Sequence, residues 1–196
     1  MAATTRPSAL YFTGNDEADA LLAEEPLALL IGFALDQQVT VPTAFLGPFK
    51  LKQRFGSLDA RKIAAADPGE LERMFREKPA IHRFPGSMAK RVQAMCRAVA
   101  DQYDNDVTRI WTEATDGRDL LRRVGALPGF GKQKAQIFVA LLGKQYGVDV
   151  AGWREAAGDY GPDGTYKSVA DIRDADSLAR VRDYKKQVKA AAKAGS

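Results

Sequence analysis

The chain has few of the residues that build metal centres or disulfides. Among its 196 residues there is one cysteine, Cys96, and one histidine, His82. A single cysteine excludes an intrachain disulfide, and within one chain it cannot supply the four thiolates of an iron–sulfur cluster. A structural zinc site would need mostly carboxylate ligands, which such sites rarely have. We therefore expect no metal and no cofactor.

Long hydrophobic runs are also missing. No apolar stretch approaches the roughly 20 residues that a membrane-spanning helix needs. The start of the chain, Met-Ala-Ala-Thr-Thr-Arg-Pro, lacks the basic residues and the apolar stretch of a secretory signal. The expectation is a cytoplasmic protein with no membrane partner.

A strong excess of one charge is absent too. The chain has 29 Lys and Arg against 25 Asp and Glu, a net charge of +4 and a pI of about 9.2. This balance is compatible with a polyanionic partner but does not require one. Each basic cluster taken alone is most simply a solvated helix face. The clusters are Arg83–Arg97, Arg118–Arg123, Lys132–Lys134 and Arg180–Lys193.

No stretch shows the alternation of apolar and polar residues that marks a half-buried strand, whereas helical spacing recurs along most of the chain. The sequence therefore predicts an all-α fold of nine or ten helices with short connections. Ser57 is a candidate cap, residues 158–166 are expected to form an ordered loop, and the Lys/Ala tail is expected to fray. The expected helices are Leu27–Asp36, Thr43–Arg54, Asp59–Ala66, Asp67–Glu77, Ser87–Tyr103, Val107–Ala114, Asp116–Val124, Lys132–Gln145 and Ser177–Tyr184.

The segment Leu127-Pro-Gly-Phe-Gly131 separates two of these helices. Gly129 and Gly131 predict a hairpin too tight for a residue with a Cβ, and Phe130 is placed to fill the apolar gap between the helices. The helix that follows begins at once, so its free N–H groups and its dipole offer a site for a phosphate oxygen. Lys132 and Lys134 add positive charge. Such a site holds a nucleic-acid backbone without reading its sequence, although a simple glycine turn between two helices is the alternative.

The longer string LPGFGKQKAQ, with Ala135 at the helix-packing position, resembles the helix-hairpin-helix motif of the HhH-GPD superfamily of DNA glycosylases. That superfamily includes endonuclease III, the adenine glycosylases and the alkylbase glycosylases. Upstream, LIGFALDQQVTV is similar to the family's buried early helix and Gln-rich turn, and HRFPGSMAKRVQAM is similar to its loop leading into a basic helix. The resemblance covers roughly residues 27–155.

The resemblance implies a two-lobed helical fold with DNA held between the lobes. One lobe would comprise residues 27–142, with the helix-hairpin-helix at about 116–145. The other would combine residues 1–26 with residues 143–196, including the basic C-terminal tail. The member implied here lacks the iron–sulfur cluster, acts as a monomer on damaged double-stranded DNA and is associated with the nucleoid.

In the family an aspartate follows the second helix of the motif at the mouth of the base pocket. The string YGVDVAGW places Asp149 there, and the resemblance implies that it is the catalytic carboxylate. A carboxylate near C1′ stabilises the cationic sugar of the transition state and orients a water molecule. The Ala151 position departs from the family pattern, in which a histidine is common. Asp149 could instead cap a helix beginning near Ala151.

The resemblance also implies a residue that fills the space left by the extruded base. Gln38 corresponds to it, with Gln37 as its neighbour. His82 could contact a phosphate or could lie in a surface loop. Aromatic side chains are candidates for the base pocket, although each could equally belong to the core. They are Phe45, Phe49, Trp111, Trp153 and Tyr160.

Members that also cleave the backbone carry a lysine two positions after the second glycine. Here that position is Gln133, and a shift by one residue on a helix turns a side chain by about 100°. The resemblance therefore implies a monofunctional DNA glycosylase, which hydrolyses the N-glycosidic bond of a damaged base and has no lyase activity. A DNA-binding protein without catalysis is the main alternative, and a helical protein-interaction domain is a third.

Overall fold

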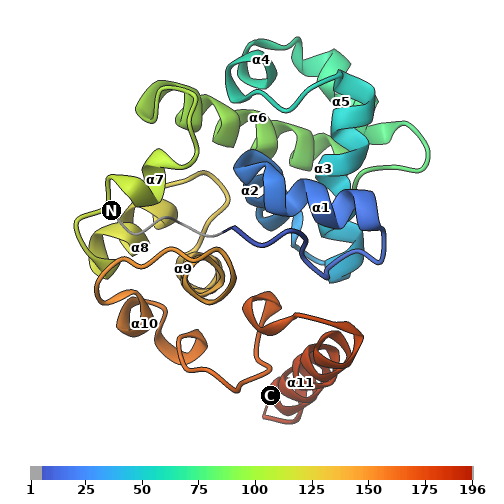
Figure 1. Cartoon of the computed structure of the whole chain (residues 1–196). Coiled ribbons are helices and arrows are strands. Elements are labelled where there is room, and N and C mark those ends of the chain that lie inside the picture. Colours follow the sequence, from blue (N-terminus) through green and yellow to red (C-terminus); the bar gives the residue numbers. More distant parts are fainter. Residues whose placement is uncertain (1–5, 196) are drawn as a thin grey trace.

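A computed structural model describes residues 6–195, and within that range the chain forms helices and turns but no strand. The predicted all-α fold is confirmed. The elements are α1 (Asp16–Glu24), α2 (Pro26–Leu35), α3 (Val41–Phe55), α4 (Ala60–Ala65), α5 (Pro68–Arg76), α6 (Pro85–Gln102), α7 (Arg109–Thr112), α8 (Gly117–Gly125), α9 (Lys132–Gln145), α10 (Trp153–Ala156), the 3-10 helices η1 (Gly158–Tyr160) and η2 (Val169–Asp171), and α11 (Ala175–Ala194) (Figure 1).

Local capping explains where several helices begin and end. Asp67 and Asp116 accept hydrogen bonds from the backbone N–H groups of the first turns of α5 and α8. Gly56 ends α3 in the left-handed region with φ of +92°. Ser57 was the expected cap of the next helix, but Asp59 performs that role by accepting from Lys62 N at 2.9 Å.

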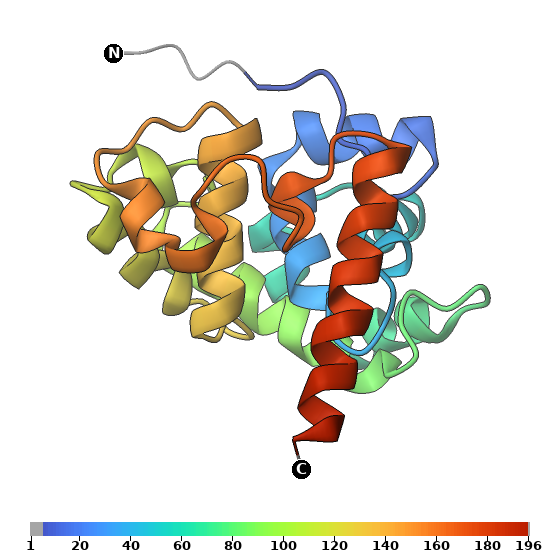
Figure 2. The ribbon, with the colours of Figure 1, turned by 90° about the horizontal axis from the view of Figure 1, so that it is seen from below.

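Helix α11 differs from the sequence expectation. The predicted helix ended near Tyr184 and the tail beyond it was expected to fray, yet α11 continues to Ala194. A reciprocal capping box between Asp174 and Ser177 starts the helix, and the Ala and Lys residues that follow have high helix propensity. Figure 2 shows the last turns of α11 projecting beyond the rest of the molecule.

The buried apolar side chains form one cluster that extends from Leu10 to Val181. Helix α2 packs on α3, α6 packs on α4 and α5, and α9 packs on α8 and η2. The predicted division into a lobe of residues 27–142 and a lobe made from both ends of the chain stays a prediction, and residues 1–5 and 196 lie outside the described residues. Within residues 6–195 no helix combines the length and hydropathy that crossing a membrane requires.

Helix α2 lies in the core and ends next to the hairpin. It is buried along nearly its whole length, as a helix that is apolar on all sides must be. Its last turn contributes Phe33, whose ring meets Phe138 of α9 edge-on at 4.9 Å between centroids. Figure 2 shows the end of α2 between α9 and α11. The chain segment that follows α2 therefore lies beside the beginning of α9.

Candidate nucleic-acid interface

The two glycines of the hairpin have different roles. Gly129 has φ of +87°, and a Cβ there would lie 2.6 Å from Cδ of Arg91, so this position requires glycine. Gly131 has φ of −81° and ψ of 177°, which any residue adopts, and nothing lies within 4 Å of its would-be Cβ. The prediction that both glycines serve the tight turn is therefore wrong for Gly131. Its missing side chain instead leaves open space in front of α9.

The first turn of α9 has unused hydrogen-bond donors. Gly131 occupies the N-cap position without a capping side chain, and the N–H groups of Lys132, Gln133 and Lys134 donate to no described residue. The positive end of a helix dipole with free N–H groups attracts anions. The Lys132 side chain is exposed beside it. This end of α9 is thus suited to a phosphate oxygen.

Phe130 anchors the hairpin to the core. Its ring is 6% exposed, stacks on Phe33 with 6.4 Å between centroids and meets Phe138 edge-on at 5.8 Å. The ring therefore fills the apolar gap as the sequence predicted and does not face solvent. Because Phe33 belongs to the last turn of α2, the hairpin packs directly against the end of α2.

The Gln-rich segment, residues 36–40 between α2 and α3, lies next to the hairpin. Gln38 is exposed and has φ of +56°, a left-handed conformation that non-glycine residues rarely adopt. The guanidinium of Arg91 donates to the side-chain oxygen of Gln37, and the Arg91 side chain lies against Gly129. Arg91 thereby links this segment to the hairpin, a role that sequence analysis missed because Arg91 read as one of several cations on the polar face of α6.

His82 is buried, so neither a phosphate contact nor a surface-loop position is correct for it. Its Nε2 lies 3.1 Å from the carbonyl oxygens of both Leu35 and Gln37, and its Nδ1 accepts from Phe84 N at 3.0 Å. The neutral ring with hydrogen on Nε2 satisfies all three contacts. Burial lowers the pKa of His82, which favours that neutral form. His82 thus fixes the backbone at the end of α2.

Asp36 is the first residue of this segment, and sequence analysis did not single it out. Its side chain is half-buried, and its carboxylate accepts no hydrogen bond and forms no ion pair with any described residue. Burial raises the pKa of Asp36, while the charges of Lys185 in α11 and Lys134 in α9 act to lower it. The two lysines are far from Asp36 in the sequence, so only the fold reveals this cluster.

Lys134 differs from Lys132 in its surroundings. Burial lowers the pKa of the Lys134 ammonium, and Arg91 lowers it further, whereas Asp36 raises it. Its charge therefore interacts with those of Asp36 and Arg91. Gln133, at the position of the family's lyase lysine, points elsewhere and donates from Nε2 to the hydroxyl of Tyr160 at 2.8 Å.

Asp149 lies at the opposite end of α9 from the hairpin. The 14 residues of α9 rise about 21 Å, and the turn after them is fixed by a bond from Val148 N to Leu142 O of 3.1 Å. Asp149 is exposed and does not cap a helix, because α10 begins at Trp153 after Gly152 without a side-chain cap. The capping alternative is wrong, and the catalytic role stays a prediction.

The sequence model of the HhH-GPD superfamily of base excision DNA repair proteins matches residues 31–194. The chain belongs to this superfamily. The match includes the hairpin, the Gln-rich segment and α11. Searches of curated proteins and of solved structures returned no significant match.

The predicted aromatic pocket is not formed in this HhH-GPD protein. Phe45 is fully buried against Phe12 and Phe33, and Trp111 is buried edge-on to Tyr146. Trp153 covers Gly143, where a Cβ would lie 2.3 Å from the indole ring.

These three rings therefore belong to the core, because helices pack closely around each of them. Phe49 is half-buried and also packs against the core. Of the aromatic candidates, only Tyr160 lies beside the beginning of α9, through its bond with Gln133.

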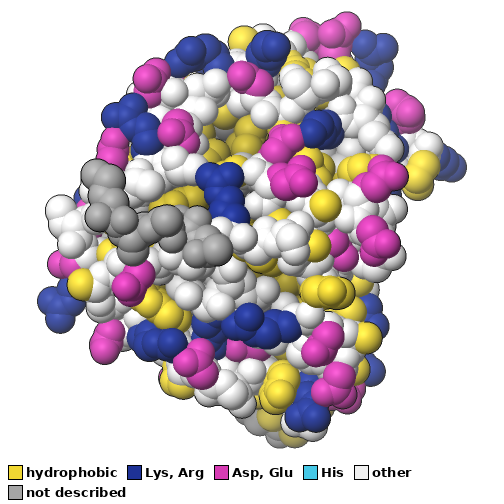
Figure 3. All heavy atoms as spheres, in the orientation of Figure 1, with side chains coloured by type: hydrophobic (Ala, Val, Ile, Leu, Met, Phe, Trp, Pro, Cys, Tyr) yellow, Lys and Arg dark blue, Asp and Glu magenta, His cyan; other side chains and the backbone are white. Residues whose placement is uncertain are grey.

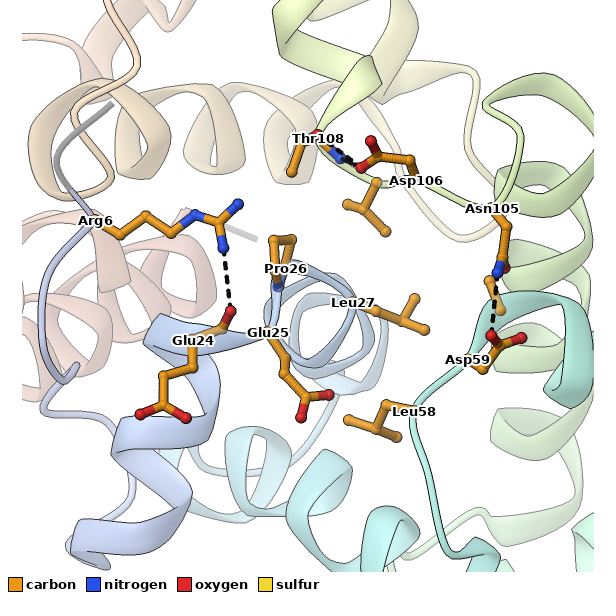
Figure 4. A pocket seen from close by; sticks show the side chains of 12 residues that line it. Arg6, Glu24, Glu25, Pro26, Leu27, Leu58, Asp59, Asn105, Asp106 and Thr108 are labelled. Atoms are coloured by element: carbon orange, nitrogen blue, oxygen red, sulfur yellow. Dashed lines mark hydrogen bonds between the residues drawn. The ribbon is translucent and has the colours of Figure 1, made fainter. Parts of the chain in front are cut away.

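A cavity of about 320 Å³ opens at the other end of α2 (Figure 4). Its charged lining residues are four acids, Glu24, Glu25, Asp59 and Asp106, and one base, Arg6, which donates to the Glu24 carbonyl at 3.1 Å. On the face of the HhH-GPD protein drawn in Figure 3, basic and acidic side chains are interspersed. Neither the cavity nor this face has the uniform positive charge that attracts a phosphate backbone.

Proposed function

We propose that this protein is a DNA glycosylase that hydrolyses the N-glycosidic bond of a damaged base in double-stranded DNA and leaves the backbone intact. The observation that carries the proposal is the open, uncapped beginning of α9 behind Gly131, in a chain that belongs to a base excision repair family. In this proposal the protein acts as a monomer, and α9 binds a phosphate of the DNA backbone.

Extrusion of the damaged base costs a few kcal/mol, which contacts to the opened duplex must offset. Gln38 is the residue we assign to the vacated space, because it is exposed at the tip of the segment next to the hairpin. The unusual backbone conformation of Gln38 supports this assignment, since strained residues are frequent at functional sites. Gln37 has a supporting position, because its side chain is bound by Arg91.

The chemical step is a hydrolysis. The bond between C1′ and the base nitrogen breaks, and its electron pair leaves with the base. The oxygen of a water molecule bonds to C1′, and the proton that it loses is taken up by a carboxylate and passes through solvent to the departing base. The carboxylate also stabilises the positive charge that develops on the sugar. The family resemblance assigns this role to Asp149.

The absence of lyase activity follows from Gln133. Backbone cleavage of this kind starts with a Schiff base between an amine and C1′, and an amide nitrogen cannot form one. Burial lowers the pKa of Lys134, which flanks Gln133. Borohydride should trap no covalent complex with DNA. Trapping that disappears in Lys134→Ala would show a bifunctional enzyme.

The deciding experiment measures release of free base from duplexes with alkylated, deaminated or oxidised bases. We expect release from at least one of them, with strand breaks appearing only after alkali. If Asp149 has the role that the resemblance assigns to it, Asp149→Asn keeps lesion binding and loses release, because the amide keeps the shape without the charge. If the protein binds duplexes but releases no base, the non-catalytic DNA-binding alternative is correct. The position of Asp149 at the far end of α9 from the hairpin favours that alternative.

A further inference from the structure

Asp36 is a second carboxylate with the properties of a reactive group. Within residues 6–195 no hydrogen-bond donor or ion-pair partner meets its oxygens, although its side chain is half-buried. No fully buried side-chain polar atom among the described residues lacks a partner, so the unpartnered oxygens of Asp36 reach solvent. Carboxylates in such partly buried positions are candidates for functional groups. The carboxylate is thus left available to a group that comes from outside the chain.

The position of Asp36 ties it to the predicted DNA contacts. It precedes Gln38 by two residues, and one turn earlier Phe33 stacks on Phe130 of the hairpin. Arg91 joins Gln37 to Gly129 from the other side. The segments that carry the beginning of α9, Gln38 and Asp36 are therefore connected by direct contacts.

Cations face Asp36 from two of the elements around it. Lys134 approaches from α9 and Lys185 from α11, and Arg91 of α6 faces Lys134. The two lysines favour the ionised carboxylate, which burial alone would disfavour. An ionised carboxylate whose side chain is half-buried stabilises a nearby cation more than it would in bulk water.

We propose that the Asp36 carboxylate, in place of Asp149, faces C1′ of the extruded nucleotide and stabilises the cationic sugar during base release. This inference rests on the proposed glycosylase function. Asp36 accepts the proton of the water whose oxygen bonds to C1′, while the electron pair of the broken bond leaves with the base. Asp149, beyond the far end of α9, has no part in that step.

Binding of a cationic sugar mimic tests the inference without knowledge of the damaged base. The probes are two otherwise identical duplexes, one with a positively charged pyrrolidine in place of a nucleotide and one with a neutral tetrahydrofuran. The wild-type protein should prefer the pyrrolidine duplex by at least about tenfold. Asp36→Asn should bring this ratio close to one, with unchanged affinity for the tetrahydrofuran duplex. Asp36→Glu should restore part of it.

The matched control is Asp101→Asn, which removes an exposed carboxylate at the far end of α6. This variant should keep the preference. Thermal unfolding and circular dichroism of each variant check the fold. A merely structural Asp36 would change the unfolding temperature and the affinity for both duplexes together, and would leave their ratio intact.

The dependence of the ratio on pH supplies a readout that survives even if Asp36→Asn fails to fold. The preference should vanish as the pH falls through the pKa of Asp36, which burial places above its ordinary value. Lys185→Gln removes a charge that lowers this pKa. The midpoint should therefore move to higher pH in Lys185→Gln.

Three results would overturn the inference: no preference in the wild-type protein, a preference that persists in Asp36→Asn, or a preference lost only in Asp149→Asn. An unmoved midpoint in Lys185→Gln would also count against it. Failure of the proposed function has a different signature, because the protein would then release no base from any lesion whatever its preference for the pyrrolidine duplex.

Discussion

At the scale of the residue, one amino-acid type serves two purposes within three positions of the hairpin. Gly129 is a glycine because its backbone is left-handed and the Arg91 side chain occupies the space of a Cβ. Gly131 meets no such constraint, and its lack of a side chain exposes the first N–H groups of α9. Sequence alone could not separate these roles, because both glycines stand in the same motif.

Substitution of Gly131 should separate folding from DNA binding. Gly131→Asp places an acceptor at the N-cap, so we expect stability to rise by about 0.3 kcal/mol. The same carboxylate repels phosphate, so affinity for duplexes should fall by about tenfold, and about equally for all sequences. Denaturant titration and fluorescence anisotropy measure the two effects.

Gly131→Ser is the matched control, because serine also caps a helix but carries no charge. It should stabilise the protein similarly and weaken DNA binding less. If Gly131→Asp binds duplexes as tightly as the wild-type protein at low salt, the beginning of α9 does not contact phosphate.

At the scale of the element, α9 connects the predicted DNA contacts with the far end of the core. Its first turn is open, whereas its last turn and the residue after it are held by neighbouring segments. The Lys144 ammonium and the Asp171 carboxylate form an almost fully buried ion pair at 2.6 Å, and Gln145 donates to three carbonyl groups in and around η2. Such an ion pair stabilises little by itself, but loss of either partner would leave a buried charge.

Tyr146 joins the end of α9 to α1. Its buried hydroxyl donates to the carbonyl oxygens of Leu22 at 2.5 Å and Ala23 at 3.1 Å, which lie in the last turn of α1. Tyr146→Phe keeps the ring but leaves these carbonyls without a donor, so the free energy of unfolding should fall by about 1–3 kcal/mol. Denaturant titration measures the loss.

Tyr11→Phe is a suitable control, because Tyr11 is 57% exposed. It should change stability by less than about 0.5 kcal/mol. Duplex affinity of Tyr146→Phe at low temperature should equal that of the wild-type protein, since α9 separates Tyr146 from the hairpin. A stability unchanged by Tyr146→Phe would show that the hydroxyl is not needed to satisfy the end of α1.

The helices themselves could be predicted where local signals fix their ends. The beginnings of α5 and α8 follow from Asp67 and Asp116, the end of α3 follows from Gly56, and the bounds of α9 agree with those expected from the sequence. Helix α1, which begins after the cap Asn15, was not predicted.

At the scale of the whole molecule, the candidate site could be predicted only in part. The hairpin and Gln38 are recognisable because each is a local pattern in the chain. Asp36 is not, because its significance depends on Lys134 and Lys185, which the fold brings to it from α9 and α11. The aromatic residues were misleading for the same reason, since burial is decided by packing and not by residue type.

His82 connects the stability of the whole fold to pH, and as the one histidine of the chain it makes that connection measurable. Its folded pKa lies below the ordinary value of 6.5, because burial of the ring, with the charges of Arg83 and Arg91, outweighs the hydrogen bonds to the Gln37 and Leu35 carbonyls, which raise the pKa. Between the folded pKa and 6.5 the unfolded chain therefore binds more protons than the folded protein. Stability contributed by His82 is present above pH 6.5 and is lost as the pH falls toward the folded pKa, by no more than about 1.4 kcal/mol per pH unit.

We expect His82→Gln to lose this part of the pH dependence. The glutamine amide can still donate to the carbonyls of Leu35 and Gln37 but does not titrate. Denaturant midpoints from pH 5 to pH 8 should therefore fall more steeply on acidification in the wild-type protein than in His82→Gln. Carboxylates, including Asp36, contribute equally to the pH dependence of stability in both proteins, so their contribution cancels when the two curves are subtracted. Parallel curves would mean that His82 titrates alike in the folded and unfolded chain. The assignment of a neutral His82 ring bonded to Leu35, Gln37 and Phe84 would then be incorrect.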